Sequence, residues 1–314
     1  MNALKTGRVI RTDAKVCHVD VDGKVLLGAP RGILFDGAHK NPVAVGDRVE
    51  IDDSTSPASL ERVLPRTNYL SRTASSHDPR EQVLAANVDQ LFVVGSVNSP
   101  GFSSNRTDRI LAACVWQHIP GRVVLNKIDL ATEQEIAALQ DTYERVPFPV
   151  VRTCAVDGRG LDELRALIAG KTSVFYGASG AGKSSLLNAL EPTLKLKTGK
   201  MSKYWETGKH TTSFSQLYRF GPETAIIDTP GIRVFRLHNV PTENLRDLFP
   251  DIVRVQSRCK FPTCTHDHEP DCAVFDAVES GALPASRYAS YVELLDERRQ
   301  GADDDDTSEA PSED

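Results

Sequence analysis

The feature that most constrains this 314-residue chain is a glycine-rich segment, Gly177-Ala178-Ser179-Gly180-Ala181-Gly182-Lys183-Ser184. It matches the pattern G-x-x-x-x-G-K-[ST] in full, follows the apolar run 173–176 and precedes a helical pattern that begins at Ser185. Glycines let a backbone wrap around phosphate oxygens, and a helix N-terminus adds favourable partial charge. The segment therefore predicts a phosphate-binding loop between a buried strand and a helix. Lys183 is expected to reach the β- and γ-phosphates, and Ser184 to bind Mg²⁺.

Short apolar runs alternate with helical patterns on both sides of this loop. Buried strands that alternate with helices predict a parallel sheet with helices on both faces, here up to about residue 238. The expected strands lie at 90–95, 123–125, 150–151 and 174–176, and the expected helices at 106–118, 132–145 and 161–169.

The chain is long enough for more than one domain. Residues 7–65 hold short alternating apolar runs separated by turns, which predicts a small β-barrel or sandwich. A five-stranded barrel of the oligonucleotide-binding type is one fit. The polar stretch 66–89 is expected to be irregular, and the part after 240 to be helical. The expected domains are a barrel at 1–70, the α/β domain at 71–238, a helical metal-binding domain at 239–300 and a disordered acidic tail at 301–314.

A second motif, Asn126-Lys127-Ile128-Asp129, follows the expected strand 123–125. The Asp129 carboxylate can accept hydrogen bonds from guanine N1–H and from the exocyclic amine, whereas adenine would leave this carboxylate unpaired. Such a mismatch costs about 1–3 kcal/mol or more. The motif predicts guanine specificity, and it disfavours a P-loop kinase or ATPase.

Two further segments are expected to contact the γ-phosphate and Mg²⁺. Asp228-Thr229-Pro230-Gly231 follows an apolar run, so Asp228 is expected to hold Mg²⁺ and the Gly231 N–H to meet the γ-phosphate. In the segment 208–212, Thr212 is the preferred further Mg²⁺ ligand, with Thr211 as its rival. Ile232 stands where many GTPases place a water-orienting glutamine, which predicts slow unaided hydrolysis. We expect His210 or a partner to complete the catalytic site.

The spacing Cys259-x4-Cys264-x-His266-x5-Cys272 predicts a metal site. In a reducing compartment, three thiolates and one imidazole within fourteen residues suit tetrahedral Zn²⁺. His268 is a rival to His266 as the fourth ligand. Four protein ligands leave no open position for a substrate, so the zinc is expected to be structural.

Charge and hydropathy narrow the class of protein. No stretch approaches 18 apolar residues and the N-terminus lacks a signal-peptide core, so we expect a cytoplasmic protein without a membrane contact. The net charge is −6, but the last twelve residues carry seven acids, and the remainder has 37 basic and 36 acidic residues. This near-neutral body lends no support to a nucleic-acid partner.

The motifs stand in an unusual order, with the guanine motif first, then the phosphate loop, then the two switch segments. They can form one site if the domain is circularly permuted, which places the second switch beside the metal-binding domain. In this order, and in segments such as Val45-Gly46-Asp47-Arg48-Val49, Thr107-Asp108-Arg109 and 259–274, the chain resembles the ribosome small subunit-dependent GTPase A family (RsgA/YjeQ) along nearly its whole length.

The resemblance implies an oligonucleotide-binding barrel, a permuted GTPase domain and a C-terminal zinc domain with His266 as the ligand. It implies weak GTP hydrolysis stimulated by the small ribosomal subunit, late maturation of that subunit, and rRNA contacts from the barrel and the zinc domain. We expect a monomer. The family's Ser-Ala guanine motif appears here as Cys154-Ala155, whose Ala155 N–H can still contact guanine O6. The alternative to a ribosomal role is a GTP-dependent switch that acts on a protein partner or an RNA-modifying enzyme.

Overall fold

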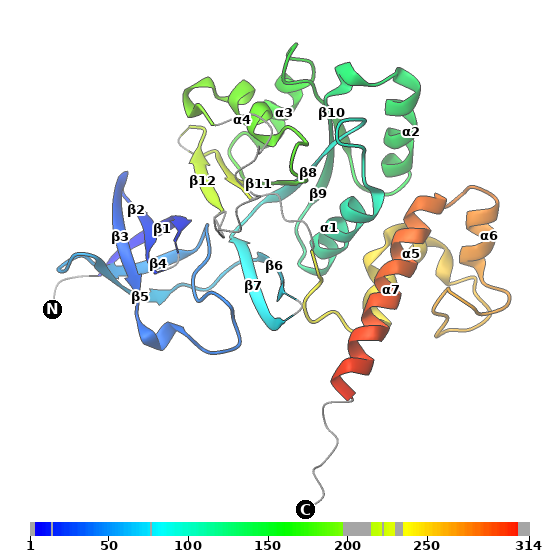
Figure 1. The fold of residues 1–314 in the computed structure, drawn as a ribbon, viewed down its shortest axis with the longest axis horizontal. Coiled ribbons are helices and arrows are strands. Elements are labelled where there is room, and N and C mark those ends of the chain that lie inside the picture. Colours follow the sequence, from blue (N-terminus) through cyan, green and yellow to red (C-terminus); the bar gives the residue numbers. More distant parts are fainter. Residues whose placement is uncertain are drawn as a thin grey trace, which may run out of the picture.

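The computed structural model describes residues 4–13, 15–75, 77–196, 215–221, 223–229 and 235–306. Along the chain it holds an N-terminal barrel, a central α/β domain and a C-terminal helical region (Figure 1).

The N-terminal region is a closed five-stranded barrel. Its strands pair in the order β1-β2-β3-β5-β4, and β4 also pairs with β1. Alternate side chains point inward, so that Val9, Val19, Ile51 and Leu60 are fully buried in a core of their own. The strands are β1 (Lys5–Thr12), β2 (Cys17–Val21), β3 (Lys24–Pro30), β4 (Arg48–Asp52) and β5 (Ala58–Val63). The expected barrel is confirmed.

The stretch 66–89, expected to be irregular, instead forms an antiparallel hairpin of β6 (Tyr69–Ser75) and β7 (Asp78–Ala86). This expectation was wrong because a hairpin is held by backbone hydrogen bonds, which polar residues form as well as apolar ones. Its buried end is supported from elsewhere in the chain. The Gln117 side chain bonds both the N–H and the hydroxyl of Ser71 on β6, and the Ala86 N–H donates to the Val45 carbonyl.

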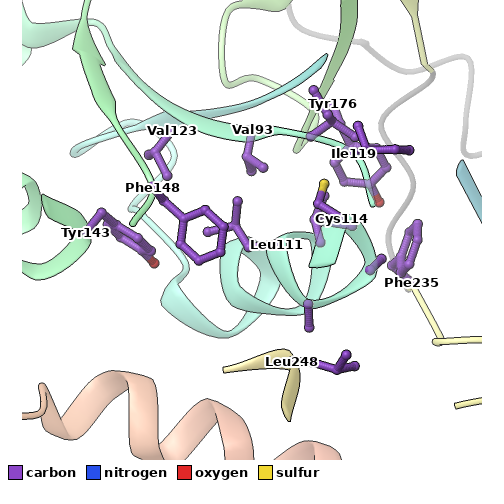
Figure 2. Close-up of a cluster of buried hydrophobic side chains, with 14 of the residues drawn as sticks. Val93, Leu111, Cys114, Ile119, Val123, Tyr143, Phe148, Tyr176, Phe235 and Leu248 are labelled. Carbon is purple, nitrogen blue, oxygen red and sulfur yellow. The ribbon is translucent and has the colours of Figure 1, made fainter. Parts of the chain in front are cut away.

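The central sheet has the order β10-β9-β8-β11-β13-β12, in which β12 alone is antiparallel to its neighbour. Successive residues of each strand face opposite layers. Val93 packs with α1 and α2, whereas Phe92 packs with α3 and α4. Figure 2 shows Val93 and Val123 on the face towards Leu111 of α1. The strands are β8 (Gln90–Ser96), β9 (Gly121–Asn126), β10 (Val150–Arg152), β11 (Thr172–Gly177), β12 (Gln216–Arg219) and β13 (Ala225–Asp228), and the helices are α1 (Ser104–Trp116), α2 (Glu133–Glu144), α3 (Leu161–Ile168) and α4 (Lys183–Leu190).

The C-terminal region is helical, as expected. It contains the 3-10 helix η4 (Thr242–Leu248), α5 (Pro250–Gln256), α6 (Ala273–Glu279) and the long helix α7 (Ala285–Asp306). Helix α7 packs against α1 and continues six residues into the segment expected to be disordered, because each residue added to an existing helix gains a hydrogen bond without a new nucleation step. Residues 307–314 lie outside the described residues. None of the helices in the described part of the chain is both long and apolar enough to cross a bilayer.

Candidate nucleotide site and metal centre

The glycine-rich loop connects the central strand β11 to helix α4, which begins at Lys183. Gly177 lies so close to β8 that a Cβ atom there would sit 2.2 Å from the Val94 carbonyl oxygen. Gly182 has a φ of +92°, and its Cβ would sit 2.4 Å from the Asn126 side-chain amide. Only glycine fits at both positions, so that the loop passes tightly over the carboxyl edge of the sheet.

Two opposite charges, on buried Lys183 and half-buried Asp228, interact beside this loop. The Lys183 ammonium donates to the Gly177 carbonyl at 2.7 Å, and burial lowers the pKa of Lys183. Asp228 ends strand β13 next to Phe175 of β11. Burial raises the pKa of Asp228 to about 6, and one of its carboxylate oxygens is buried without a hydrogen-bond partner among the residues that the structure describes. A cation held by this carboxylate and an anion held by the lysine would satisfy both groups.

The guanine motif joins the phosphate loop directly, although 55 residues separate the two bonded positions. The Asn126 side-chain amide donates to the Ala181 carbonyl at 2.9 Å, and the Thr153 hydroxyl donates to the Asn126 side-chain oxygen at 3.1 Å. Lys127 adopts the left-handed conformation, and its ammonium donates to the Ser99 carbonyl at 2.6 Å. The carboxyl ends of β9, β10 and β11 thus bring the motifs into one site.

Asp129 lies in the loop that follows β9 and is exposed. Cys154 lies in the loop that follows β10 and is fully buried. The Cys154 sulfur lies 3.1 Å from Asp129 Oδ1. Gly160 holds the next loop against β10, because a Cβ atom there would lie 1.8 Å from the Arg152 carbonyl oxygen. Ile128 and Ala155 flank these two residues in the chain, and Ser184 and Ser185 occupy the first turn of α4.

The cysteines and histidine predicted to bind a metal converge on one point. Ligand atoms of Cys259, Cys264, His266 and Cys272 all lie within 4.8 Å of one another. His266 Nδ1 lies 3.6 Å from the Cys259 sulfur and 3.5 Å from the Cys272 sulfur, and the Cys264 and Cys272 sulfurs are 3.7 Å apart. A tetrahedron with Zn–S bonds of about 2.3 Å has edges of about 3.8 Å, so the group fits zinc.

The rival histidine lies outside this group. The side chain of His268 is 72% exposed and pairs with Asp267, whereas His266 is fully buried. Helix α7 supports the loop that carries the ligands. The Tyr288 hydroxyl donates to the His266 carbonyl at 2.8 Å, and the Tyr291 hydroxyl donates to the Thr265 carbonyl at 2.6 Å.

Comparison with known proteins identifies the family. The family model described as RsgA GTPase matches residues 63–238, more than half of the chain. The chain belongs to the RsgA GTPase family. Its central α/β domain is therefore the GTPase domain, with the guanine motif before the phosphate loop.

Relatives extend this match over nearly the whole chain. A protein of Bacteroides thetaiotaomicron named small ribosomal subunit biogenesis GTPase RsgA 2 is 40% identical, over 83% of this chain and 86% of its own length. An RsgA of Chlorobaculum parvum is 38% identical, over 94% of this chain and 99% of its own length. The crystal structure of YjeQ from Thermotoga maritima superposes with a TM-score of 0.71 at 32% identity, covering 94% of this chain and 98% of the other. YloQ, described as a circularly permuted GTPase, superposes with a TM-score of 0.66 at 30% identity, covering 95% of this chain and 96% of the other.

Five predicted residues of this RsgA-family chain cannot be placed. His210, Thr211, Thr212, Gly231 and Ile232 lie outside the described residues.

Sequence reasoning also missed a buried ion-pair group between the GTPase domain and the C-terminal region. Arg287 of α7 bonds Asp108 of α1 at 2.8 Å and Asp251 of α5 at 2.9 and 3.1 Å, and Tyr143 of α2 donates to Asp108 at 3.0 Å. The available signal was an acidic residue, Asp108, within the apolar pattern of a helix that otherwise faces the core.

Proposed function

We propose that this chain is a GTP hydrolase that acts in late maturation of the small (30S) ribosomal subunit. The observation that carries the proposal is the Asn126–Ala181 hydrogen bond, which joins a guanine motif to a phosphate loop that follows it in the chain. This permuted arrangement is shared with a family whose relatives are named small ribosomal subunit biogenesis GTPases.

Guanine recognition is assigned to Asp129, which is exposed and lies beside the loop of Ala155. Its carboxylate would accept from guanine N1–H and from the exocyclic amine, while the Ala155 N–H would donate to O6. The Lys127 stem would cover the base, since its ammonium is already held at Ser99. Adenine has no N1–H donor, so it would leave the Asp129 carboxylate without its partners.

Phosphate and Mg²⁺ binding are assigned to the edge formed by β11 and β13. The loop N–H groups and Lys183 would bind the phosphates. Ser184, Asp228 and Thr212 would hold Mg²⁺, with Thr211 as the alternative to Thr212. This assignment is supported by the buried Asp228 oxygen, which has no hydrogen-bond partner within the described part of the chain. The ion would neutralise charge on the β- and γ-phosphates, and the Gly231 N–H would contact the γ-phosphate.

Hydrolysis by the isolated protein should be slow, because Ile232 has no polar group that can orient water. His210 is our candidate for the group that completes the site once the small subunit is bound. A His210→Ala variant that kept full subunit-stimulated activity would remove this residue from consideration.

The two regions that flank the GTPase domain are assigned the role of contacting the ribosome. The barrel and the C-terminal region would contact rRNA, and the Cys3His group would hold one structural Zn²⁺. The protein would act as a monomer in the cytoplasm.

The decisive experiment measures GTP hydrolysis with and without purified small subunits. We expect stimulation by small subunits and none by large subunits. Absence of stimulation would favour a switch that acts on a protein partner. Efficient displacement of bound GTP by ATP would contradict the guanine assignment.

A further inference from the structure

The loop that carries the predicted zinc ligands is held from outside by a row of backbone contacts. The three consecutive carbonyl groups of residues 264–266 each accept a hydrogen bond from a side chain elsewhere in the chain. Two of the donors are the tyrosine hydroxyls of α7 that hold Thr265 and His266. The third donor is Arg246 of η4, whose Nη1 donates to the Cys264 carbonyl at 2.9 Å.

The backbone of this loop requires such support. His266 has a φ of +62°, in the left-handed region that a residue with a Cβ atom adopts only at a cost in free energy. Its Nε2 is buried and has no hydrogen-bond partner within the described residues, although a metal-bound histidine usually donates from its second ring nitrogen. The orientation of the His266 ring therefore depends on the contacts of the surrounding backbone.

Arg246 is well placed to supply one of these contacts. Its neighbours in η4, Leu245 and Leu248, are buried in the apolar cluster of the GTPase domain, which fixes the turn that carries the arginine. The Arg246 side chain is half-buried, and its Nη1 also donates to the Pro262 carbonyl at 3.3 Å. One guanidinium group thus connects a fixed turn of the GTPase core to two points of the ligand loop.

The charge of Arg246 suits the same place. Three thiolates, one neutral imidazole and Zn²⁺ together carry a net charge of −1. Burying such a charge costs free energy unless a cation lies nearby. Two other cations at this loop, Lys260 and Arg299, each pair with an acid of the loop. Within the described part of the chain Arg246 has no ion pair, and its hydrogen bonds go to carbonyl groups.

We propose that Arg246 is a positioning residue for the zinc site, which holds the Cys264 carbonyl and balances the negative charge of the zinc and its ligands. This inference rests on the proposed zinc site and adds a residue outside the four ligands. The affinity for zinc then depends on a turn of the GTPase core as well as on the cysteines and the histidine.

The test measures the dissociation constant of the full chain for Zn²⁺ by competition with a chromophoric chelator. Arg246→Ala should raise this constant about 10-fold to 100-fold, the range typical for the loss of a group that supports a metal ligand. Arg246→Lys keeps the charge and a donor, and should restore most of the affinity. Arg246→Met keeps an extended side chain without the charge or the donor. It should behave like Arg246→Ala, and it decides the result if the alanine variant fails to fold.

Co²⁺ in place of Zn²⁺ shows whether the four ligands are intact, because its visible absorption depends on the number and the kind of ligands. Arg246→Ala should reach the wild-type spectrum, but at a higher concentration of Co²⁺. Arg254→Ala is the matched control. Arg254 of α5 also donates to a carbonyl group, that of Arg145 at 2.6 Å, which lies outside the ligand loop. This variant should leave the dissociation constant for Zn²⁺ unchanged.

Three results would overturn the proposal. Arg246→Ala could bind Zn²⁺ as tightly as the wild type, Arg246→Lys could bind it as weakly as Arg246→Ala, or the Co²⁺ spectrum of the saturated alanine variant could differ from that of the wild type. Wild-type protein that binds no Zn²⁺ would contradict the zinc assignment itself, which is a different outcome.

Discussion

The two regions that flank the GTPase domain are attached to it in different ways. The barrel has an apolar core of its own, which includes Val19 and Leu60. The C-terminal region does not, because Leu248, Phe249 and Ile252 belong to the same cluster as Leu111 of α1. Figure 2 shows Leu248 on the outer side of α1, opposite the sheet. By this measure the C-terminal region is part of the GTPase domain's core.

The polar contacts follow the same division. The barrel meets the GTPase domain through scattered contacts. Arg8 donates to the Thr172 hydroxyl at 2.9 Å, β1 and β12 share one residue pair, and Val45 packs into the apolar cluster of the GTPase domain. The C-terminal region is joined by Arg287, which is 1% exposed and bonded to Asp108 and Asp251. A buried group of one cation and two acids gains little net free energy, but it penalises any other placement of the helices.

This difference has a mechanical consequence. A region that shares a core must unfold with its neighbour, whereas a region with a separate core can shift or unfold alone. The barrel is joined at β12, the strand that follows the segment 197–214, where the first switch is expected. We therefore expect motion of the barrel relative to a GTPase domain and zinc region that move together.

Removal of zinc should have the largest effect. Structural zinc contributes about 10 kcal/mol or more of binding free energy in small zinc domains. Cys264→Ser, or treatment with a chelator, should lower the unfolding midpoint of the GTPase domain, because the GTPase domain and the C-terminal region share a core. This midpoint is measured by denaturant unfolding in which the loss of GDP binding is monitored. Cys17→Ser, at a buried cysteine of the barrel, is the control. Unchanged GTPase unfolding after zinc loss would show that the regions are independent.

Loss of Arg287 should have the second-largest effect on stability. Arg287→Ala leaves two carboxylates facing each other without their cation, and should lower the free energy of unfolding by about 3–5 kcal/mol. Arg145→Ala is the matched control, since Arg145 also links α2 to the C-terminal region, through the Gly281 carbonyl, but is exposed. Equal effects of the two variants would contradict a special role for the buried group.

One substitution made in each core tests the comparison directly. Leu248→Ala and Leu60→Ala should each lower the free energy of unfolding by about 2–5 kcal/mol. Only Leu248→Ala should shift the transition that abolishes GDP binding, whereas Leu60→Ala should destabilise the barrel alone. Calorimetry with and without GDP distinguishes the two transitions. A shift of the GDP-linked transition by Leu60→Ala would show that the barrel is coupled to the GTPase domain.

The smallest effect is expected at the junction between the barrel and the sheet. Arg219 of β12 pairs with Asp20 of the barrel, and the arginine side chain is 56% exposed. Arg219→Gln should change stability by about 0.2–1 kcal/mol, because such pairs are screened by solvent. Hydrogen exchange of β1 is the sensitive measurement, and faster exchange is expected there without a change in α7.

Local patterns were sufficient for the elements that carry the motifs. The strands that end at Asn126, Gly177 and Asp228 were each expected from an apolar run, and the helices α1, α2 and α3 from their periodicity. The hairpin β6–β7 was missed, because its polar residues show no such pattern and its support comes from Gln117 and Val45. The assignment of individual residues to GTP and Mg²⁺ remains a prediction.

By itself, the sequence determined which chemical groups are present and in what order, because a phosphate loop, a guanine motif and a set of zinc ligands are each written within a few neighbouring residues. Only the tertiary structure decided which distant groups meet. Asp108 and Arg287 are 179 residues apart in the chain, and Cys154 and Asp129 are 25 apart. Contacts of this kind depend on how whole layers pack, since burial and desolvation act on surfaces that no local pattern contains.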